Sequence, residues 1–216
     1  EEKLVIYKEA TAKYASVLSK YPRSDYVDDA LYNTAWGLIN LDRKEEALPI
    51  FEQIVAEHSD GRYGARSQFT LGDYYYGQKV YDKATESYEK FLAMFPDDKL
   101  ESGDKGLRRK ATVLLGHLSE IDAYNMYAVG ERFFDGKEFD EAIEIFKDVQ
   151  NKYPDSDQTV NAAVNIGAAY MALEDYRKAA AEFQRVVDTY EGEDRFSPQV
   201  DFARQQLEVM AEARVI

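Results

Sequence analysis

Apolar residues recur along the chain three and four positions apart, and small residues interrupt them at regular intervals. One stretch shows the pattern fully: Gly130 is followed by Phe139, Ala142 and Phe146, and the stretch closes at Pro154. Apolar positions with this spacing lie on one face of an α-helix, and proline cannot continue a helix. The stretch therefore predicts two short antiparallel helices whose closest contact is Gly130 against Ala142.

This stretch is one copy of a repeat. An alanine followed four residues later by an aromatic residue occurs at Ala10/Tyr14, Ala47/Phe51, Ala84/Tyr88, Ala142/Phe146 and Ala179/Phe183. Successive alanines are 37, 37, 58 and 37 residues apart. Equal intervals of this length are typical of an internal structural repeat. The long interval corresponds to one repeat with 21 additional residues.

The repeat predicts a single all-α array across residues 1–216. Its parts are a leading half repeat, four full helix pairs and a C-terminal capping helix, expected at residues 1–22, 24–59, 60–96, 124–154, 155–191 and 197–216. In the last helix, Arg204 stands at the register position that is otherwise small, at Ala35, Gly72, Gly130 and Gly167. A bulky side chain there blocks the close approach of a following helix, so this helix is predicted to cap the array.

Residues 97–123 carry the additional length, which is too short for a further helix pair of about 34 residues. Apolar residues continue through the segment at helical spacing, at Leu107, Ala111, Leu114, Leu118 and Ile121. This pattern favours an N-terminal extension of the first helix in the third pair. The alternative is a separate helix that breaks near Ser119.

Pro49 lies within the second helix predicted for residues 24–59. Proline is tolerated in the first turn of a helix, but deeper in the helix it removes a backbone hydrogen bond. This helix is therefore expected to start late or to kink at Pro49.

These positions resemble the tetratricopeptide repeat family. The resemblance rests on glycine, aromatic and alanine positions of three pairs, namely Gly72, Tyr75, Tyr81, Ala84 and Tyr88, then Gly130, Phe133, Phe139, Ala142 and Phe146, then Gly167, Tyr170, Tyr176, Ala179 and Phe183. It is weaker in the first pair, where Ala35 replaces the glycine and Lys44 replaces the aromatic residue. The resemblance implies a right-handed solenoid whose first helices line a concave groove, and a role in protein interaction.

A finer resemblance concerns the period and the ends of the helix pairs. The usual repeat has about 34 residues, whereas this chain repeats every 37 and contains the phrases KYPRS at 20–24 and KYPDS at 152–156. Together these features look like the bacterial cell-envelope branch of the family, such as the Tol–Pal coordinator and the outer-membrane-assembly lipoproteins. That branch implies a periplasmic or cell-envelope protein, with a cytoplasmic location as the alternative.

The charge and composition restrict the classes of partner. The net charge is −14, and nucleic-acid binding needs a basic surface, so no nucleic-acid partner is expected. A basic protein partner suits this charge. No apolar run approaches the roughly 20 residues of a membrane span, so direct membrane insertion is not expected. The chain begins Glu1-Glu2-Lys3 without methionine, and we expect it to be an excised or processed segment.

Groups that could support catalysis are scarce. The chain has two histidines, His58 and His117, and no cysteine, and it carries no zinc-protease, serine-hydrolase or phosphate-loop motif. The acidic residues at 135–141 lack the alternating oxygen ligands and central glycine of a calcium loop. The sequence therefore predicts no enzyme, no catalytic residue, no metal site and no cofactor.

The predicted groove is the better candidate for function. In repeat register, its inward positions carry Tyr32, Trp36, Asn40, Phe69, Asp73, Tyr76, Tyr127, Glu131 and Phe134, followed by Asn165, Ala168 and Met171 in the fourth pair. Aromatic rings offer large contact areas, and carboxylates beside them can hold Arg or Lys. We expect an aromatic, acidic groove that binds a partner peptide or amphipathic helix carrying basic residues. The alternative for each aromatic residue is that it only packs neighbouring repeats.

A different function is also compatible with the sequence. The array could be a structural spacer or a self-association module of a larger envelope protein, with residues 97–123 and the chain ends as interfaces. A basic cluster at the start of the additional segment, formed by Lys105, Arg108, Arg109 and Lys110, could contact an acidic partner or another copy of this acidic chain. Its alternative is a solvated helix face.

Overall fold

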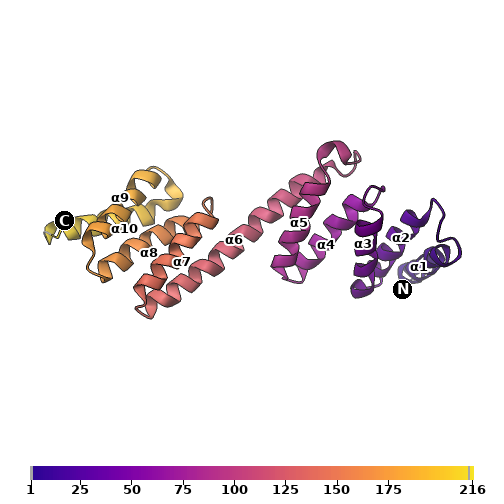
Figure 1. Cartoon of the computed structure of the whole chain (residues 1–216), viewed down its shortest axis with the longest axis horizontal. Helices are drawn as coiled ribbons and strands as arrows, with labels where there is room; N and C mark the ends of the chain where they lie inside the picture. Colours follow the sequence, from indigo (N-terminus) through magenta and orange to yellow (C-terminus); the bar gives the residue numbers. More distant parts are fainter. Residues whose placement is uncertain (1, 214) are drawn as a thin grey trace. The chain divides into compact units, whose positions relative to one another are not determined.

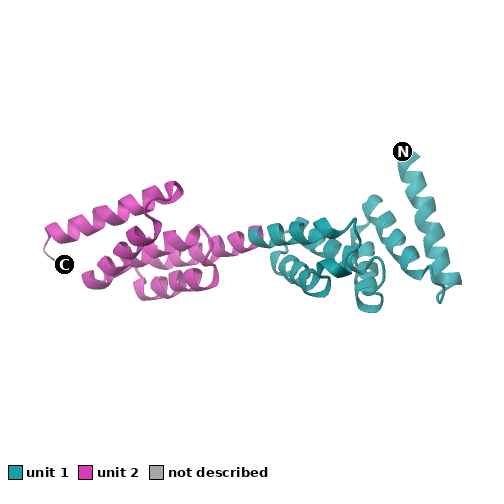
Figure 2. Ribbon diagram, turned by 90° about the horizontal axis from the view of Figure 1, so that it is seen from above, with its two compact units in different colours: residues 1–116 teal, residues 117–216 magenta. Residues whose placement is uncertain are grey.

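The computed structural model describes residues 2–213 and 215–216, and this part of the chain is built from ten α-helices and two short 3₁₀ helices (Figure 1). The chain divides into two compact units, unit 1 with residues 1–116 and unit 2 with residues 117–216 (Figure 2). Helix α6 begins in unit 1 and ends in unit 2. Within each unit, consecutive helices pack against one another.

Unit 1 contains five complete helices, a 3₁₀ helix and the start of α6. These are α1 (Glu2–Lys20), α2 (Val27–Asn40), α3 (Lys44–Glu57), α4 (Gly64–Gly77), α5 (Tyr81–Met94), η1 (Asp97–Lys99) and α6 (Lys105–Asp135). Unit 2 contains the rest of α6, then α7 (Phe139–Lys152), α8 (Gln158–Ala172), α9 (Tyr176–Tyr190), η2 (Asp194–Phe196) and α10 (Ser197–Glu212).

The additional segment is mostly helical. Residues 105–123 belong to α6, which continues without interruption into the first helix of the third pair. Residues 97–104 form η1 and the turn that joins η1 to the start of α6. Of the two alternatives for this segment, the structure therefore contains the extended helix, and no break occurs at Ser119.

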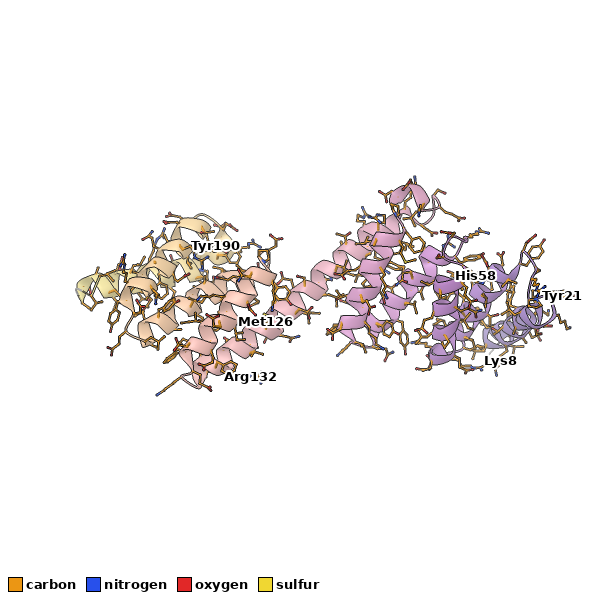
Figure 3. The ribbon with its side chains drawn as sticks, viewed as in Figure 1. Lys8, Tyr21, His58, Met126, Arg132 and Tyr190 are labelled. Atoms are coloured by element: carbon orange, nitrogen blue, oxygen red, sulfur yellow. The ribbon has the colours of Figure 1, made fainter. Side chains whose placement is uncertain are left out.

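The core of each unit follows the apolar stripes of its helices. In unit 1, Ala47, Phe51 and Ile54 of α3 are fully buried against α2 and α4. In unit 2, Phe146 of α7 is fully buried between α6 and α8, and Met126 packs against the same cluster (Figure 3). Burial of one such side chain stabilises the fold by about 1.5–3 kcal/mol, so each helix pair is held chiefly by its apolar faces.

The small residues allow an aromatic ring to lie against the facing helix. A Cβ atom added to Gly130 would lie 2.5 Å from Cε1 of Phe146, and one added to Gly72 would lie 2.6 Å from Cε1 of Tyr88. The predicted closest contact of Gly130 with Ala142 is therefore wrong, because the ring of Phe146 covers the space beside Gly130. Gly167 faces Phe183 in the same way.

The turn within each helix pair has the same backbone conformation. A residue with a positive φ of 58–63° follows each first helix, at Asp42, Lys79, Lys137 and Glu174. The N–H of the next residue donates to the carbonyl five residues earlier, as Arg43 does to Leu38 at 2.9 Å. This bond is the signature of a Schellman helix end, which usually uses glycine at the positive-φ position.

Helix α3 does not start late. It begins at Lys44, so Pro49 is its sixth residue. Of the two alternatives expected for this helix, the late start is wrong, and the kink at Pro49 stays a prediction. Pro49 cannot donate to the carbonyl of Glu45, and a proline inside a helix costs about 3 kcal/mol. Complete burial of Phe51 and Ile54 on the opposite face offsets this cost.

Two further features bear on function. His58, at the end of α3, places Nδ1 2.7 Å from Oδ1 of Asp28 in α2, which ties the two helices of this pair together (Figure 3). Among residues 2–213 and 215–216, every helix is too short or too polar to span a bilayer. The same residues contain no group of three or more His, Asp or Glu side chains placed to hold a metal ion.

Candidate functional site

A pocket of about 650 Å³ lies in unit 1 between α2, α4 and the start of α6. Its lining includes Tyr32, Trp36, Arg66, Phe69, Asp73 and Lys110. We call this pocket the unit 1 groove. It contains four of the predicted partner-binding residues, since Tyr32, Trp36, Phe69 and Asp73 all contribute to it.

Two other predicted residues of unit 1 do not line the groove. Asn40 donates from Nδ2 to the carbonyl of Trp36 at 2.8 Å. Tyr76 packs its ring against Tyr81, with the ring centres 6.2 Å apart. Both side chains are therefore engaged by groups next to the groove and do not contribute to its lining.

The aromatic residues of the groove differ in how much of their surface is exposed to solvent. Tyr32 and Phe69 are only 8% and 4% exposed, and the ring of Tyr32 stacks on that of Tyr63 at 4.1 Å. These two residues form the floor and also pack the helices together. Trp36 is 39% exposed and meets Tyr32 edge-on at 6.3 Å. Trp36 therefore offers the accessible aromatic surface.

One polar network crosses the groove. Tyr88 donates from its hydroxyl to Oδ1 of Asp73 at 2.6 Å, and Lys110 donates from Nζ to Oδ2 of the same carboxylate at 2.9 Å. The ammonium group of Lys110 also lies 4.7 Å from the ring centre of Phe69. Burial raises the pKa of the Tyr88 hydroxyl well above its ordinary value, and the hydrogen bond to Asp73 raises it further.

A second ion pair lies at the other side of the groove. Arg66 donates from Nε to Oδ1 of Asp104 at 2.7 Å. Asp104 is only 4% exposed, and this hydrogen bond raises the pKa of the Arg66 guanidinium. Because Asp104 directly precedes α6, the pair ties the start of that helix to α4.

The charge of the groove differs from the acidic groove expected from the sequence. Its lining contains Lys44, Arg66 and Lys110 as well as Asp73 and Asp104. The expectation missed Lys44 and Lys110 because it considered only the first helices of the regular pairs, whereas Arg66 lies on such a helix, α4, outside the inward positions that were considered. Lys110 comes from the additional segment and Lys44 from the start of α3.

Two of the four residues in the predicted basic cluster, Arg108 and Lys110, make hydrogen bonds within unit 1. Arg108 donates from Nη1 to the carbonyls of Leu92 and Phe95, both at 2.7 Å, and so satisfies the C-terminal end of α5. Lys110 lines the groove. Lys105 and Arg109 are exposed.

In unit 2, the predicted residues pack mainly against their neighbours. Tyr127 accepts a hydrogen bond from Nδ2 of Asn165 at 2.8 Å and packs its ring on that of Phe146. Phe134 packs edge-on against Phe139 at 5.3 Å. Burial raises the pKa of Tyr127, and the charge of Glu131 adds to this effect. Glu131 is the exposed member of the unit 2 set.

A larger cavity of about 740 Å³ lies near the turn that joins α3 to α4 and the end of α5. Its lining includes Arg62, Glu101 and the buried ring of Phe95. Nε of Arg62 lies 3.6 Å from Oε1 of Glu101. Most of its lining comes from connecting segments. It lacks an accessible aromatic anchor comparable to Trp36, so the groove is the stronger candidate for a binding site.

Comparison with protein families identifies the fold. The tetratricopeptide repeat model matches residues 29–61, 124–156 and 161–192, and a second model of the same description matches residues 65–98. Each match covers one helix pair, and together they cover more than half of the chain. The chain belongs to the tetratricopeptide repeat family. The predicted all-α fold of tetratricopeptide helix pairs is therefore confirmed, and the family is a protein-interaction fold without catalytic function.

One solved structure that the chain resembles is described as the TPR2AB-domain–pHSP90 complex of yeast Sti1. The two chains share 17% sequence identity, the TM-score is 0.43, and the comparison covers 96% of this tetratricopeptide chain and 80% of the other. No curated protein matches the chain.

Proposed function

We propose that this chain is a non-catalytic scaffold whose unit 1 groove binds an extended peptide segment of a partner protein. The observation that carries the proposal is the accessible ring of Trp36 in a pocket of about 650 Å³. Ligand pockets commonly measure about 300–1,000 Å³. Tryptophan is enriched among residues that contribute most to protein binding.

The polar side chains around Trp36 suit a peptide backbone. Thr70, Tyr74 and Gln78 line the groove in addition to its charged residues. Their hydroxyl and amide groups can donate and accept hydrogen bonds, and an extended peptide presents unpaired N–H and C=O groups along its length. Trp36 then receives an apolar side chain of the peptide.

In unit 2, we propose Glu131 as the residue of the predicted set that contacts a partner. It is exposed, whereas Tyr127 and Phe134 are partly buried and engaged in packing. A basic residue of the partner is the matching group for its carboxylate.

We also propose that the protein works in the bacterial cell envelope, in the periplasm. The 37-residue period and the two KYP phrases support this placement. Fractionation of cells that produce the full-length protein tests it, and recovery with the cytoplasmic fraction contradicts it.

Self-association is the second candidate function, and the exposed face of α1 favours it. Leu4, Val5 and Ile6 are exposed there, and Ile6, Tyr14 and their neighbours line a shallow pocket of about 400 Å³. Apolar surface of this kind can be buried by a second copy. Light scattering tests this candidate: a molar mass that rises with concentration in the wild type but not in an Ile6→Lys variant supports it, and a constant monomer mass contradicts it.

Peptide binding can be measured directly because Trp36 is the only tryptophan in the chain. Peptides of 12 residues are selected from a random display library on the immobilised protein and then titrated into it. Binding in the groove should shift the fluorescence of Trp36 to shorter wavelengths and protect it from iodide quenching. Peptides that bind while Trp36 emission and quenching stay unchanged would place the site elsewhere.

A further inference from the structure

We propose that Phe69 and Asp73 form a subsite for the side chain of a lysine or arginine of the partner, and that Lys110 fills this subsite until the partner replaces it. The inference rests on the proposed function, because it names a chemical feature of the peptide that the unit 1 groove binds. It also assigns a role to the basic residue that α6 contributes to the groove.

The geometry is that of a cation receptor. The ammonium of Lys110 lies 4.7 Å from the ring centre of Phe69 and 2.9 Å from Oδ2 of Asp73. A cation within about 6 Å of a ring centre is attracted by the ring's negative face. A carboxylate beside the ring adds a charge-assisted hydrogen bond. Both elements of the receptor belong to α4 and persist without Lys110.

The carboxylate of the receptor is held in place. Tyr88 is fully buried and donates its hydroxyl to Oδ1 of Asp73, which leaves Oδ2 directed toward Lys110. The other helix pairs carry Phe51, Phe146 and Phe183 at the position of Tyr88. The hydroxyl that fixes Asp73 is therefore an individual feature of this pair and not a requirement of the repeat.

Lys110 is an exchangeable occupant. Its side chain is 54% exposed, and exposed ion pairs contribute little to stability. The second ion pair of the groove behaves differently, because Asp104 is nearly buried and would lose its partner if Arg66 moved. A peptide can thus displace Lys110 into solvent at small cost, whereas Arg66 stays in place.

The occupant comes from a part of the chain outside the regular repeat. Lys110 lies in the additional segment, on the first residues of α6, and reaches the groove beside Leu107. Because a ligand must first displace Lys110, its apparent affinity for the subsite is reduced. The groove then favours peptides that combine a basic residue with a second anchor for Trp36.

A small cation tests the subsite without any knowledge of the partner. n-Butylguanidinium is titrated into the whole protein, and binding is followed by NMR through the indole N–H of Trp36 and neighbouring amides. Lys110→Gln should tighten binding about three- to tenfold, as expected for removal of one exposed competing cation. Lys105→Gln is the matched control, because it removes the same charge from an exposed position on the same helix outside the groove.

The subsite is further tested by combining Lys110→Gln with Asp73→Asn. The double variant should lose the gain in n-butylguanidinium affinity, because the carboxylate of the receptor is gone. Equal affinities of Lys110→Gln and Lys105→Gln would overturn the inference. A gain that persists in the double variant would overturn it as well.

Peptide selection separates this inference from the proposed function. Twelve-residue peptides selected on the Lys110→Gln variant should be enriched in lysine or arginine relative to those selected on wild type. Peptides that bind through Trp36 without this enrichment, or that are acidic on both proteins, overturn the subsite and leave the proposed function standing. If no peptide engages Trp36 while n-butylguanidinium behaves as expected, the peptide-binding function fails and the cation subsite stands.

Discussion

Helix α4 of unit 1 and helix α6, where it enters unit 2, carry related residues in the same repeat register but use them differently. Phe69 and Asp73 of unit 1 correspond to Tyr127 and Glu131 of unit 2. Asp73 is held by hydrogen bonds from Tyr88 and Lys110 and lines a groove. In unit 2, the hydroxyl of Tyr127 is engaged by Asn165, and Glu131 is exposed. The repeat thus fixes the position of each side chain on its helix. The residue type at each position then decides whether neighbouring side chains form a site.

This difference has two local causes. Helix α5 of unit 1 places a tyrosine, Tyr88, where α7 of unit 2 has Phe146, so at this register position unit 1 has a buried hydroxyl and unit 2 has none. The start of α6 then adds Lys110 and Leu107 to the unit 1 groove. Neither cause changes the packing of the helix pairs, because Tyr88 and Phe146 are both fully buried against a glycine.

The largest expected effect tests the packing that the two units share. Gly130→Ala should lower the free energy of unfolding by about 2–3 kcal/mol, because the new methyl group would meet the ring of Phe146. Gly116→Ala, on the same helix with no atom within 4 Å of the added Cβ, should stabilise the protein by up to about 1 kcal/mol. Urea unfolding measures both, and equal effects would contradict the assigned packing.

A second comparison concerns the two ion pairs of the groove. Arg66→Met should destabilise the protein by about 2 kcal/mol, because it leaves the carboxylate of Asp104 buried without its partner. Lys110→Met should change stability by less than about 0.5 kcal/mol, since its ion pair with Asp73 is exposed. Thermal and urea unfolding distinguish the two variants. A large loss for Lys110→Met would show that Lys110 is a structural residue.

The third prediction isolates the hydroxyl of Tyr88. Tyr88→Phe should cost about 1–1.5 kcal/mol, because the ring is accommodated at this position in other pairs and only the hydrogen bond to Asp73 is lost. A hydroxyl whose pKa is raised in the folded state stabilises the protein below the unfolded value of 10.0. That contribution is lost as the pH rises above this value.

The raised pKa of Tyr88 also predicts how the unfolding free energies of the wild type and of Tyr88→Phe differ at high pH. Unfolding free energy of the wild type should fall between pH 10 and 11 more steeply than that of the variant, because the variant lacks one of the tyrosines that stay protonated in the fold. Urea unfolding at a series of pH values measures the difference. Parallel curves for the two proteins would contradict the buried, hydrogen-bonded state of Tyr88.

The smallest effect concerns a turn of unit 2. Lys137→Gly should stabilise the protein by up to about 1 kcal/mol, because Lys137 has a φ of 63°, a conformation that costs non-glycine residues energy. Lys147→Gly, in the interior of α7, is the control and should destabilise by about 1 kcal/mol. If Lys137→Gly also destabilises, the strain assigned to this turn is absent.

The repeat made much of the fold predictable from the sequence. The alternation of helices followed from the spacing of residues such as Ala84 and Tyr88, because buried helical faces require that period. The lining of the groove was predictable only in part. Trp36 and Asp73 followed from the register, whereas Asp104 and Lys110 depend on the path of residues 97–104, for which the repeat supplies no template. Pro49 showed that packing of α3 overrides a local helix-breaking preference.

The central claim is that the unit 1 groove, and not the equivalent face of unit 2, binds the partner peptide. The most direct test compares the affinity of display-selected peptides for wild type, Trp36→Ala and Glu131→Ala, where Glu131 holds the register position of Trp36 in unit 2. With circular dichroism unchanged in both variants, Trp36→Ala should weaken binding at least about tenfold, the loss expected for a central aromatic anchor. Glu131→Ala should weaken it less than about threefold, as for an exposed charge. Full affinity in Trp36→Ala, or a greater loss in Glu131→Ala, would contradict the claim.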